Sequence, residues 1–359
     1  MRHLARLMAP MILLIVSGCE DNSADAVLSD YVARVSNTLE QDTDNDDPYQ
    51  NLVAFPPRRE RHIAITELRA GLMEALSLSS CELLPLIAER NSSLGKVMKP
   101  STLLRYELRF FERLESCYRR YQNSTSENPG FLHLLTETYQ LKSANLENSL
   151  WNGIFTSEAI EGNFSLSKGP IPLAGNPGFG ASLRALKFFN NLVDSTIQYR
   201  NGDPFLLPNT LPKIERHYFA LHRSEYGSQL IKSLALLTYH LEKTASALNK
   251  AQLRRPLCFS GKPTEKAKIL NNILIKYYAG KVQPYMSRVQ RNGQAWLKQT
   301  NLLVNNERLP VPAAMQKYHA AVLDMKNPDA PWSRYQQAIK THTHAWQTIL
   351  QQCGLMPEN

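Results

Sequence analysis

The five cysteines are the residues of this chain whose type and spacing point most directly to chemistry: Cys19, Cys81, Cys117, Cys258 and Cys353. No two of them form a Cys-x-x-Cys motif, and no histidine stands at ligand spacing from any of them, so we expect no metal site. No Cys–His pairing indicates a catalytic thiol either, which leaves acylation or oxidation to a disulfide. Cys19 lies near the N-terminus, apart from the others, and the other four are an even number that allows three disulfide connectivities.

Cys19 closes a segment with the three parts of a secretory signal peptide. A basic start precedes an apolar run over 7–16, which is too short to cross a bilayer as a helix, and two small residues follow it. The string Val16-Ser17-Gly18-Cys19 resembles the lipobox at which bacterial lipoprotein precursors are cleaved. We therefore expect residues 1–18 to be a signal peptide, and we expect Cys19 to be lipidated and to hold the chain on a membrane through its acyl chains.

The other four cysteines are expected to form disulfides, because an exported chain folds in an oxidising compartment. Of the three connectivities we favour Cys81–Cys117 and Cys258–Cys353. The first pair would flank a compact helical hairpin. The second would join the end of the last helix to an interhelical loop.

The charge of the chain is basic but dispersed: 41 Lys and Arg residues stand against 32 Asp and Glu residues. The longest basic clusters are pairs such as Arg58-Arg59, which indicate a solvated surface with at most a weak attraction to anionic lipid or cell-wall polymer. We expect no nucleic-acid partner for an exported protein. We expect anchoring in the outer rather than the inner membrane, although the acidic residues Glu20 and Asp21 can favour inner-membrane retention.

Apolar residues recur at helical spacing along most of the chain, without a convincing run of alternating strand residues. The predicted fold is all-α, a helical array in which two long antiparallel helices fill the C-terminal half. The expected organisation is a lipidated tether over 19–61 with one amphipathic helix and an acidic, proline-containing linker, an N-terminal helical region over 62–161, a Gly/Pro loop over 162–180 and a C-terminal helical region over 181–359.

Individual helices are predicted over 24–41, from Ile65 to Leu76, over 83–90, from Pro100 with Ser101 as N-cap, and from Pro129 to Phe155. Leu211 to Lys250 and the segment after Thr264 are the two long helices, the second kinked near Gly280 and Pro284. The last helix, over 332–352, carries His342 on its apolar face, which indicates a buried core histidine.

The most distinctive polar string is Glu89-Arg90-Asn91-Ser92. These four side chains could line a binding pocket, since several hydrogen-bonding groups are adjacent. They could equally end a helix, with Gly95 near the position after its last turn, and this second interpretation is the favoured one.

Three strings resemble functional motifs but lack essential parts. Residues 175–182 match the spacing of a nucleotide-binding loop, but Ala181 stands where a lysine contacts the phosphates. Glu115-Ser116 resembles the catalytic glutamate region of lytic transglycosylases without the rest of that signature. The aspartates of 42–47 lack the glycine and the distal glutamate of a calcium loop. We therefore expect no nucleotide, no cofactor and no identifiable catalytic residue.

Taken together, the lipobox and four further strings resemble an uncharacterised family of gammaproteobacterial lipoproteins: Leu86 to Gly95, Cys258 to Thr264, Val282 to Tyr285, and the ending from Trp346 to Leu355. The resemblance covers nearly the whole chain and implies an envelope location without an activity. The expectation is a non-catalytic periplasmic lipoprotein that binds an envelope protein or cell-wall partner or supports the envelope. The alternative is an envelope hydrolase with carboxylates that the sequence does not single out.

Overall fold

The structure is a computed structural model, and it describes residues 23–41, 46–67, 71–122, 129–199, 203–259 and 261–356. These residues are mostly helical and include no β-strand, which confirms the all-α prediction. Cys19, the expected signal peptide and residues 42–45 of the aspartate string lie outside the described residues.

The helices follow one another along the chain, with the longest connections after α1, after α8 and after α9. Their bounds are α1 Ala24–Leu39, α2 Arg58–Arg61, α3 Leu72–Ser77, α4 Leu84–Asn91, α5 Pro100–Tyr121, α6 Pro129–Ala144, α7 Leu146–Phe155, α8 Glu158–Phe164, α9 Phe179–Gln198, α10 Ile214–Ser224, α11 Tyr226–Arg254, α12 Glu265–Ile273, α13 Gln283–Val304, α14 Ala313–Tyr318 and α15 Pro331–Gln352. Short 3-10 turns and two π-helical segments, Leu274–Val282 and His319–Leu323, complete the helical structure.

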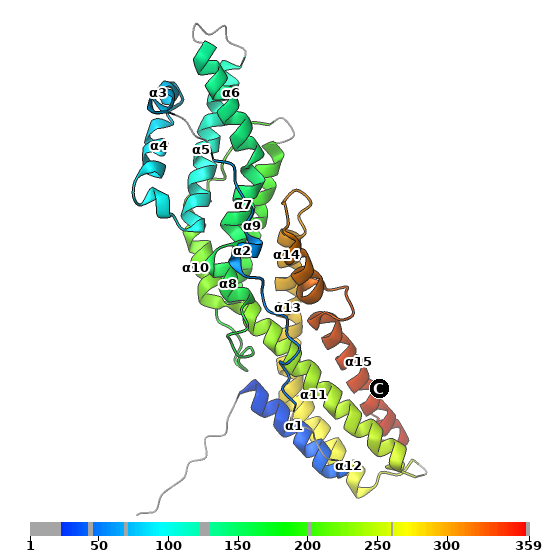
Figure 1. Cartoon of the computed structure of the whole chain (residues 1–359). Helices are drawn as coiled ribbons and strands as arrows, with labels where there is room; N and C mark the ends of the chain where they lie inside the picture. Colours follow the sequence, from blue (N-terminus) through cyan, green and yellow to red (C-terminus); the bar gives the residue numbers. More distant parts are fainter. Residues whose placement is uncertain are drawn as a thin grey trace, which may run out of the picture.

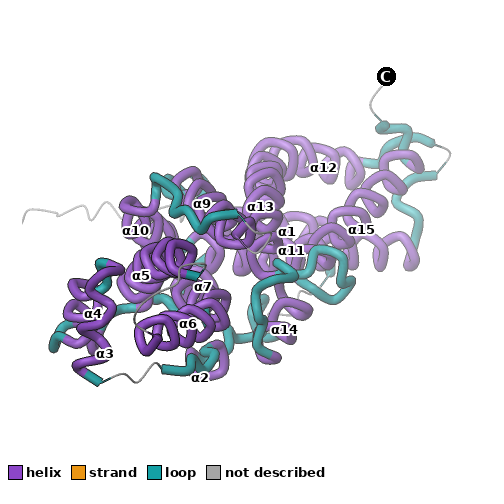
Figure 2. The backbone as a smooth tube through the Cα atoms, turned by 90° about the horizontal axis from the view of Figure 1, so that it is seen from above, coloured by secondary structure: helices purple, strands orange, loops and turns teal. Residues whose placement is uncertain are grey.

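The helices form an elongated molecule of two bodies that share one hydrophobic core (Figure 1). We call α3–α10 the N-terminal body, and α1 with α11–α15 the C-terminal body. The axis of the second is α11, whose 29 residues span about 43 Å and pack against α15 and α1. The two bodies meet where α9 lies beside α13 and where α8 contacts α11 (Figure 2).

Helix α1 belongs to the core of the C-terminal body. Its buried face, which includes Leu28, Tyr31 and Val35, packs against α11 and α12. The Tyr31 hydroxyl lies 2.8 Å from Nε2 of His342 on α15. The sequence assigned this helix to a tether, whereas the structure makes it a packed element, because its apolar stripe finds a partner in α11.

The division between the two bodies also differs from the expected loop at 162–180. Helices α9 and α10 follow that loop, yet α10 packs against α5 and α8 of the N-terminal body. The break falls instead at Glu225, whose φ of 42° separates α10 from α11. The single helix predicted from Leu211 to Lys250 is therefore two helices. In the same way, the helix predicted from Pro129 to Phe155 is divided at Asn145 into α6 and α7.

Residues 62–67 are not helical, so the helix predicted from Ile65 onward is wrong over its first part. The cause is a pair of asparagine side chains, Asn152 in α7 and Asn145 directly before that helix. Asn152 accepts a hydrogen bond from the Ile63 amide at 2.9 Å and donates one to its carbonyl at 2.7 Å, as a neighbouring strand would. Asn145 donates to the Thr66 carbonyl at 2.8 Å. Local periodicity cannot reveal these partners, which lie about 80 to 90 residues away in sequence.

The other helix boundaries follow local signals, with two corrections. Thr264 caps α12 as expected, since its hydroxyl accepts a hydrogen bond from the Ala267 amide. Ser101, the expected cap of α5, lies inside that helix and donates to Glu215 instead, while Pro100 occupies the first turn. A π-helical segment over Leu274–Val282 precedes Pro284, where a kink was expected.

Both predicted disulfides are confirmed. Cys81 and Cys117 join the turn before α4 to α5, with 5.3 Å between their Cα atoms. Cys258 and Cys353 join the loop after α11 to the end of α15, with 5.2 Å between their Cα atoms. The second bond closes 95 residues of the C-terminal body.

Candidate functional site

A basic face of α9 carries the candidate site. Leu186, Phe189 and Val193 turn one side of this helix into the core, while Arg184 and Lys187 stay exposed on the other. The two cations are three positions apart, so they lie on neighbouring turns of the same face. The side chain of Asn176 accepts a hydrogen bond from the Gly178 amide and so orders the entry to α9.

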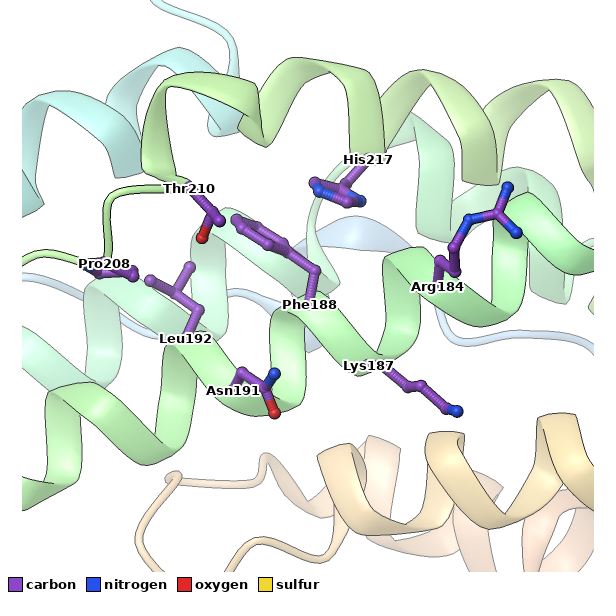
Figure 3. Close-up of a pocket in the computed structure, with 8 residues that line it drawn as sticks. All are labelled: Arg184, Lys187, Phe188, Asn191, Leu192, Pro208, Thr210 and His217. Carbon is purple, nitrogen blue, oxygen red and sulfur yellow. The ribbon is translucent and has the colours of Figure 1, made fainter.

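Next to these cations, α9, α10 and the segment before α10 line an open hollow of about 310 Å³ (Figure 3). Arg184 and Lys187 lie at one end of it, and Pro208 and Thr210 lie at the other. Between them, the ring of Phe188 stacks on the imidazole of His217 with 4.0 Å between centroids and 10° between planes. The hollow therefore combines a largely apolar floor with a cationic end.

The electrostatic environment of the hollow is positive. Burial lowers the pKa of His217, and the nearby charges of Arg216, Arg184 and Lys213 lower it further. No carboxylate lines the hollow, and in the described part of the chain no ion pair neutralises Arg184 or Lys187. Such an arrangement can hold an anionic group against an apolar surface, but it lacks the paired carboxylates of a hydrolase.

A second hollow of about 330 Å³ lies beside the loop between α13 and α14. Two of its polar side chains share contacts with a residue outside it: Nε2 of His319 lies 2.9 Å from Nδ2 of Asn305 and 2.7 Å from Oδ1 of Asn301. Burial lowers the pKa of His319. Glu307 is the single carboxylate in its lining, so this hollow also lacks a facing pair.

The comparisons with known proteins bear on the whole chain rather than on either hollow. A family model described as a protein of unknown function, DUF3080, matches residues 28–357. The chain belongs to the DUF3080 family. No curated protein and no solved structure matches it. Membership in DUF3080 assigns no activity and no site, so the candidate site rests on its geometry.

In this DUF3080 chain, the polar string Glu89 to Ser92 closes the end of α4. Arg90 donates to the Gly95 carbonyl at 2.6 Å, and the Ser92 hydroxyl accepts from the Gly95 amide at 2.9 Å. A Cβ at position 95 would lie 2.1 Å from the Glu89 carbonyl oxygen, so only glycine fits there. Glu89 in addition pairs with Arg109 of α5 at 3.6 Å, and none of the four side chains lines either hollow. Helix α4 ends within the string at Asn91, whereas Gly95 begins a 3-10 turn instead of standing directly after the last turn of α4.

The remaining candidates from the sequence also have structural roles. The carboxylate of Glu115 is buried in α5 and forms an ion pair with Arg119 one turn later. His342 is buried, and burial lowers its pKa to about 3, so it is neutral at physiological pH. Within the described ranges, no three His, Cys, Asp or Glu side chains are placed to hold a metal ion. None of the described helices is both long and apolar enough to span a bilayer.

The α9–α10 hollow was not predicted from the sequence. The available signal was weak: the pair Arg184 and Lys187 beside Phe188 in one helix, and Lys213, Arg216 and His217 in another. Nothing in the sequence places these two groups side by side, because the contact between α9 and α10 is tertiary.

Proposed function

We propose that this protein is a periplasm-facing lipoprotein of the bacterial envelope that binds an anionic cell-wall polymer in the α9–α10 hollow. In this proposal the acyl chains of Cys19 anchor it, preferably in the outer membrane, and it catalyses no reaction. The observation that supports a binding role is that the exposed cations Arg184 and Lys187 lie beside the apolar floor around Phe188. A charged polymer segment contacts both kinds of surface at once.

The envelope location is supported by two independent features. The sequence up to Cys19 has the order of a lipoprotein signal peptide. The body carries two disulfides between cysteines that are 36 and 95 residues apart, and such bonds persist in oxidising compartments.

The position of the hollow suits a partner away from the membrane. Asp25, at the start of α1, lies 3.5 Å from His240, which is about half-way along α11. The chain thus enters the fold beside the C-terminal body, whereas the hollow belongs to the N-terminal body beyond the start of α11 (Figure 1). An anchored molecule would present the hollow toward the cell wall.

The first prediction concerns the anchor. Mass spectrometry of the wild-type protein should find an acylated N-terminal Cys19. A lipid-free protein, in which Cys19→Ser is combined with a signal peptide cleaved by the general signal peptidase, should fractionate with soluble periplasmic proteins, because it lacks the acyl chains that hold the wild type on the membrane. A wild-type protein with an unmodified N-terminus at another residue would refute this part of the proposal.

The second prediction concerns the hollow. Arg184→Ala combined with Lys187→Ala should weaken co-sedimentation of the lipid-free protein with purified cell-wall sacculi by about tenfold or more, since each cation contributes a charge-assisted contact. The binding should also weaken with added salt. Lys317→Ala combined with Lys340→Ala removes the same charge from exposed sites on α14 and α15 and should leave binding unchanged. Equal loss in the two double variants would show a nonspecific charge effect and would contradict the proposal.

A further inference from the structure

A second exposed surface lies at the far end of the C-terminal body, opposite the hollow. We call it the distal tip and define it by these residues: Leu253, Arg254, Arg255, Phe259, Lys262 and Met356. They come from the end of α11, the connection to α12, and the residues after α15, which meet at the lower right of Figure 1.

The distal tip is held in shape by the fold. The Cys258–Cys353 disulfide joins the connection after α11 to the end of α15. Gly354 has a φ of 64°, and a Cβ there would lie 2.6 Å from the Gly261 carbonyl oxygen, so a glycine permits this close approach of two backbones. The Leu355 amide donates to the Leu350 carbonyl at 2.8 Å, which closes α15.

The tip exposes large apolar side chains. The exposed fractions are 88% for Leu253, 56% for Phe259 and 42% for Met356. Several such side chains at one end of an ordered structure form an apolar patch, whereas single scattered ones are ordinary on a protein surface.

Cations surround these apolar side chains. Arg254, Arg255 and Lys262 are exposed, and no ion pair engages them within the described ranges. The nearby carboxylates of Glu40 and Glu265 are instead paired with Lys266 and Lys268. The guanidinium of Arg255 lies 5.6 Å from the centre of the Phe259 ring, so positive charge and apolar surface are directly adjacent.

We propose that the distal tip docks on an anionic phospholipid bilayer. Its apolar side chains enter the boundary between headgroups and acyl chains, and its cations contact lipid phosphates. This inference rests on one part of the proposed function, the anchoring of the chain on a membrane through Cys19. It adds a second, non-covalent membrane contact that sets the orientation of the body.

The length of chain before α1 allows both contacts on one bilayer. The start of α1 lies about 20 Å along α11 from Leu253, since His240 and Leu253 are 13 residues apart in that helix. The five residues from Cys19 to Ser23 can extend to about 17 Å. A tilted body can therefore rest its tip on the membrane that holds the acyl chains, with the α9–α10 hollow directed away.

The test uses the lipid-free protein and vesicles of phosphatidylglycerol with phosphatidylethanolamine. It should bind these vesicles, and should bind neutral phosphatidylcholine vesicles at least tenfold more weakly. Arg254→Gln with Arg255→Gln, and Leu253→Ser with Phe259→Ser, should each reduce binding to the anionic vesicles about tenfold or more. Leu94→Ser with Val97→Ser removes comparable exposed apolar groups from the N-terminal body and should have no effect.

Insertion is measured separately with Phe259→Trp. Brominated acyl chains should quench the emission of this tryptophan, whereas Leu94→Trp should not be quenched. Absence of quenching, equal binding to neutral vesicles, or concentration-dependent dimerisation that the tip variants abolish would overturn the proposal. The tip variants should still bind sacculi, and the Arg184 and Lys187 variants should still bind vesicles, so failure of one site is distinguishable from failure of the other.

Discussion

Replacing Cys258 and Cys353 together by serine is expected to lower the free energy of unfolding by about 4–5 kcal/mol. The bond closes 95 residues, and the chain entropy that such a cross-link removes from the unfolded state increases with the length of the closed loop. This loss is comparable to much of the stability of an ordinary domain. The double replacement is preferred because a single one would leave a reactive thiol.

Urea unfolding under non-reducing conditions measures this change. Trp332 and Trp346 on α15 report on the C-terminal body, and Trp151 on α7 reports on the N-terminal body. The matched control is Cys81→Ser with Cys117→Ser, which opens a loop of 36 residues and should cost about 3.5–4 kcal/mol. A loss below about 1 kcal/mol for the longer loop, or disulfides that pair differently in peptide mapping, would contradict the expectation.

Arg61→Ala is expected to lower the free energy of unfolding by about 3–5 kcal/mol. The Arg61 side chain is fully buried, and its guanidinium donates to the carbonyls of Pro56 and Phe155 and to the carboxylate of Glu161. Its removal leaves two carbonyl groups without these donors and opens space beneath the ring of Phe55. The lost hydrogen bonds also join α2 to the end of α7 and to α8.

These contacts attach the connection after α1 to both bodies. The centre of the Phe55 ring lies 4.9 Å from that of Phe164 in α8 and 5.0 Å from that of Tyr318 in α14. Because the Arg61 guanidinium lies against the Phe55 ring, it supports a contact between the two bodies. Arg61→Lys should lower the free energy of unfolding by less than Arg61→Ala, because lysine keeps the positive charge. It should still be destabilising, because an ammonium group cannot direct bonds to three separate acceptors in the geometry of the guanidinium.

Arg59→Ala is the control for Arg61, since Arg59 lies in the same short helix with 85% of its side chain exposed. It should change the free energy of unfolding by less than about 0.5 kcal/mol. Thermal and urea unfolding measure the free energy of unfolding of the three variants. An Arg61→Ala protein as stable as Arg59→Ala would show that the buried guanidinium contributes no net stability.

The sequence alone determined the features that depend on neighbouring residues. The stripe of Leu104, Leu108 and Phe111 repeats at helical spacing and lies buried in α5, and Thr264 caps α12 as predicted. These signals are local because helical hydrogen bonds and caps join residues three or four positions apart. The disulfide pairing was also predictable. Four cysteines remain once Cys19 is set aside, and the expected helical segments bring Cys81 near Cys117 and Cys258 near Cys353.

The tertiary structure alone decided the features that depend on distant partners. Residues 62–67 are not helical because the side chains of Asn145 and Asn152 supply hydrogen bonds that a helix would have supplied within itself. Helix α1 is a core element because its apolar stripe meets α11. The candidate site followed the same rule: the stacking of Phe188 on His217 exists only once α9 and α10 pack together, and no spacing along the chain encodes that contact.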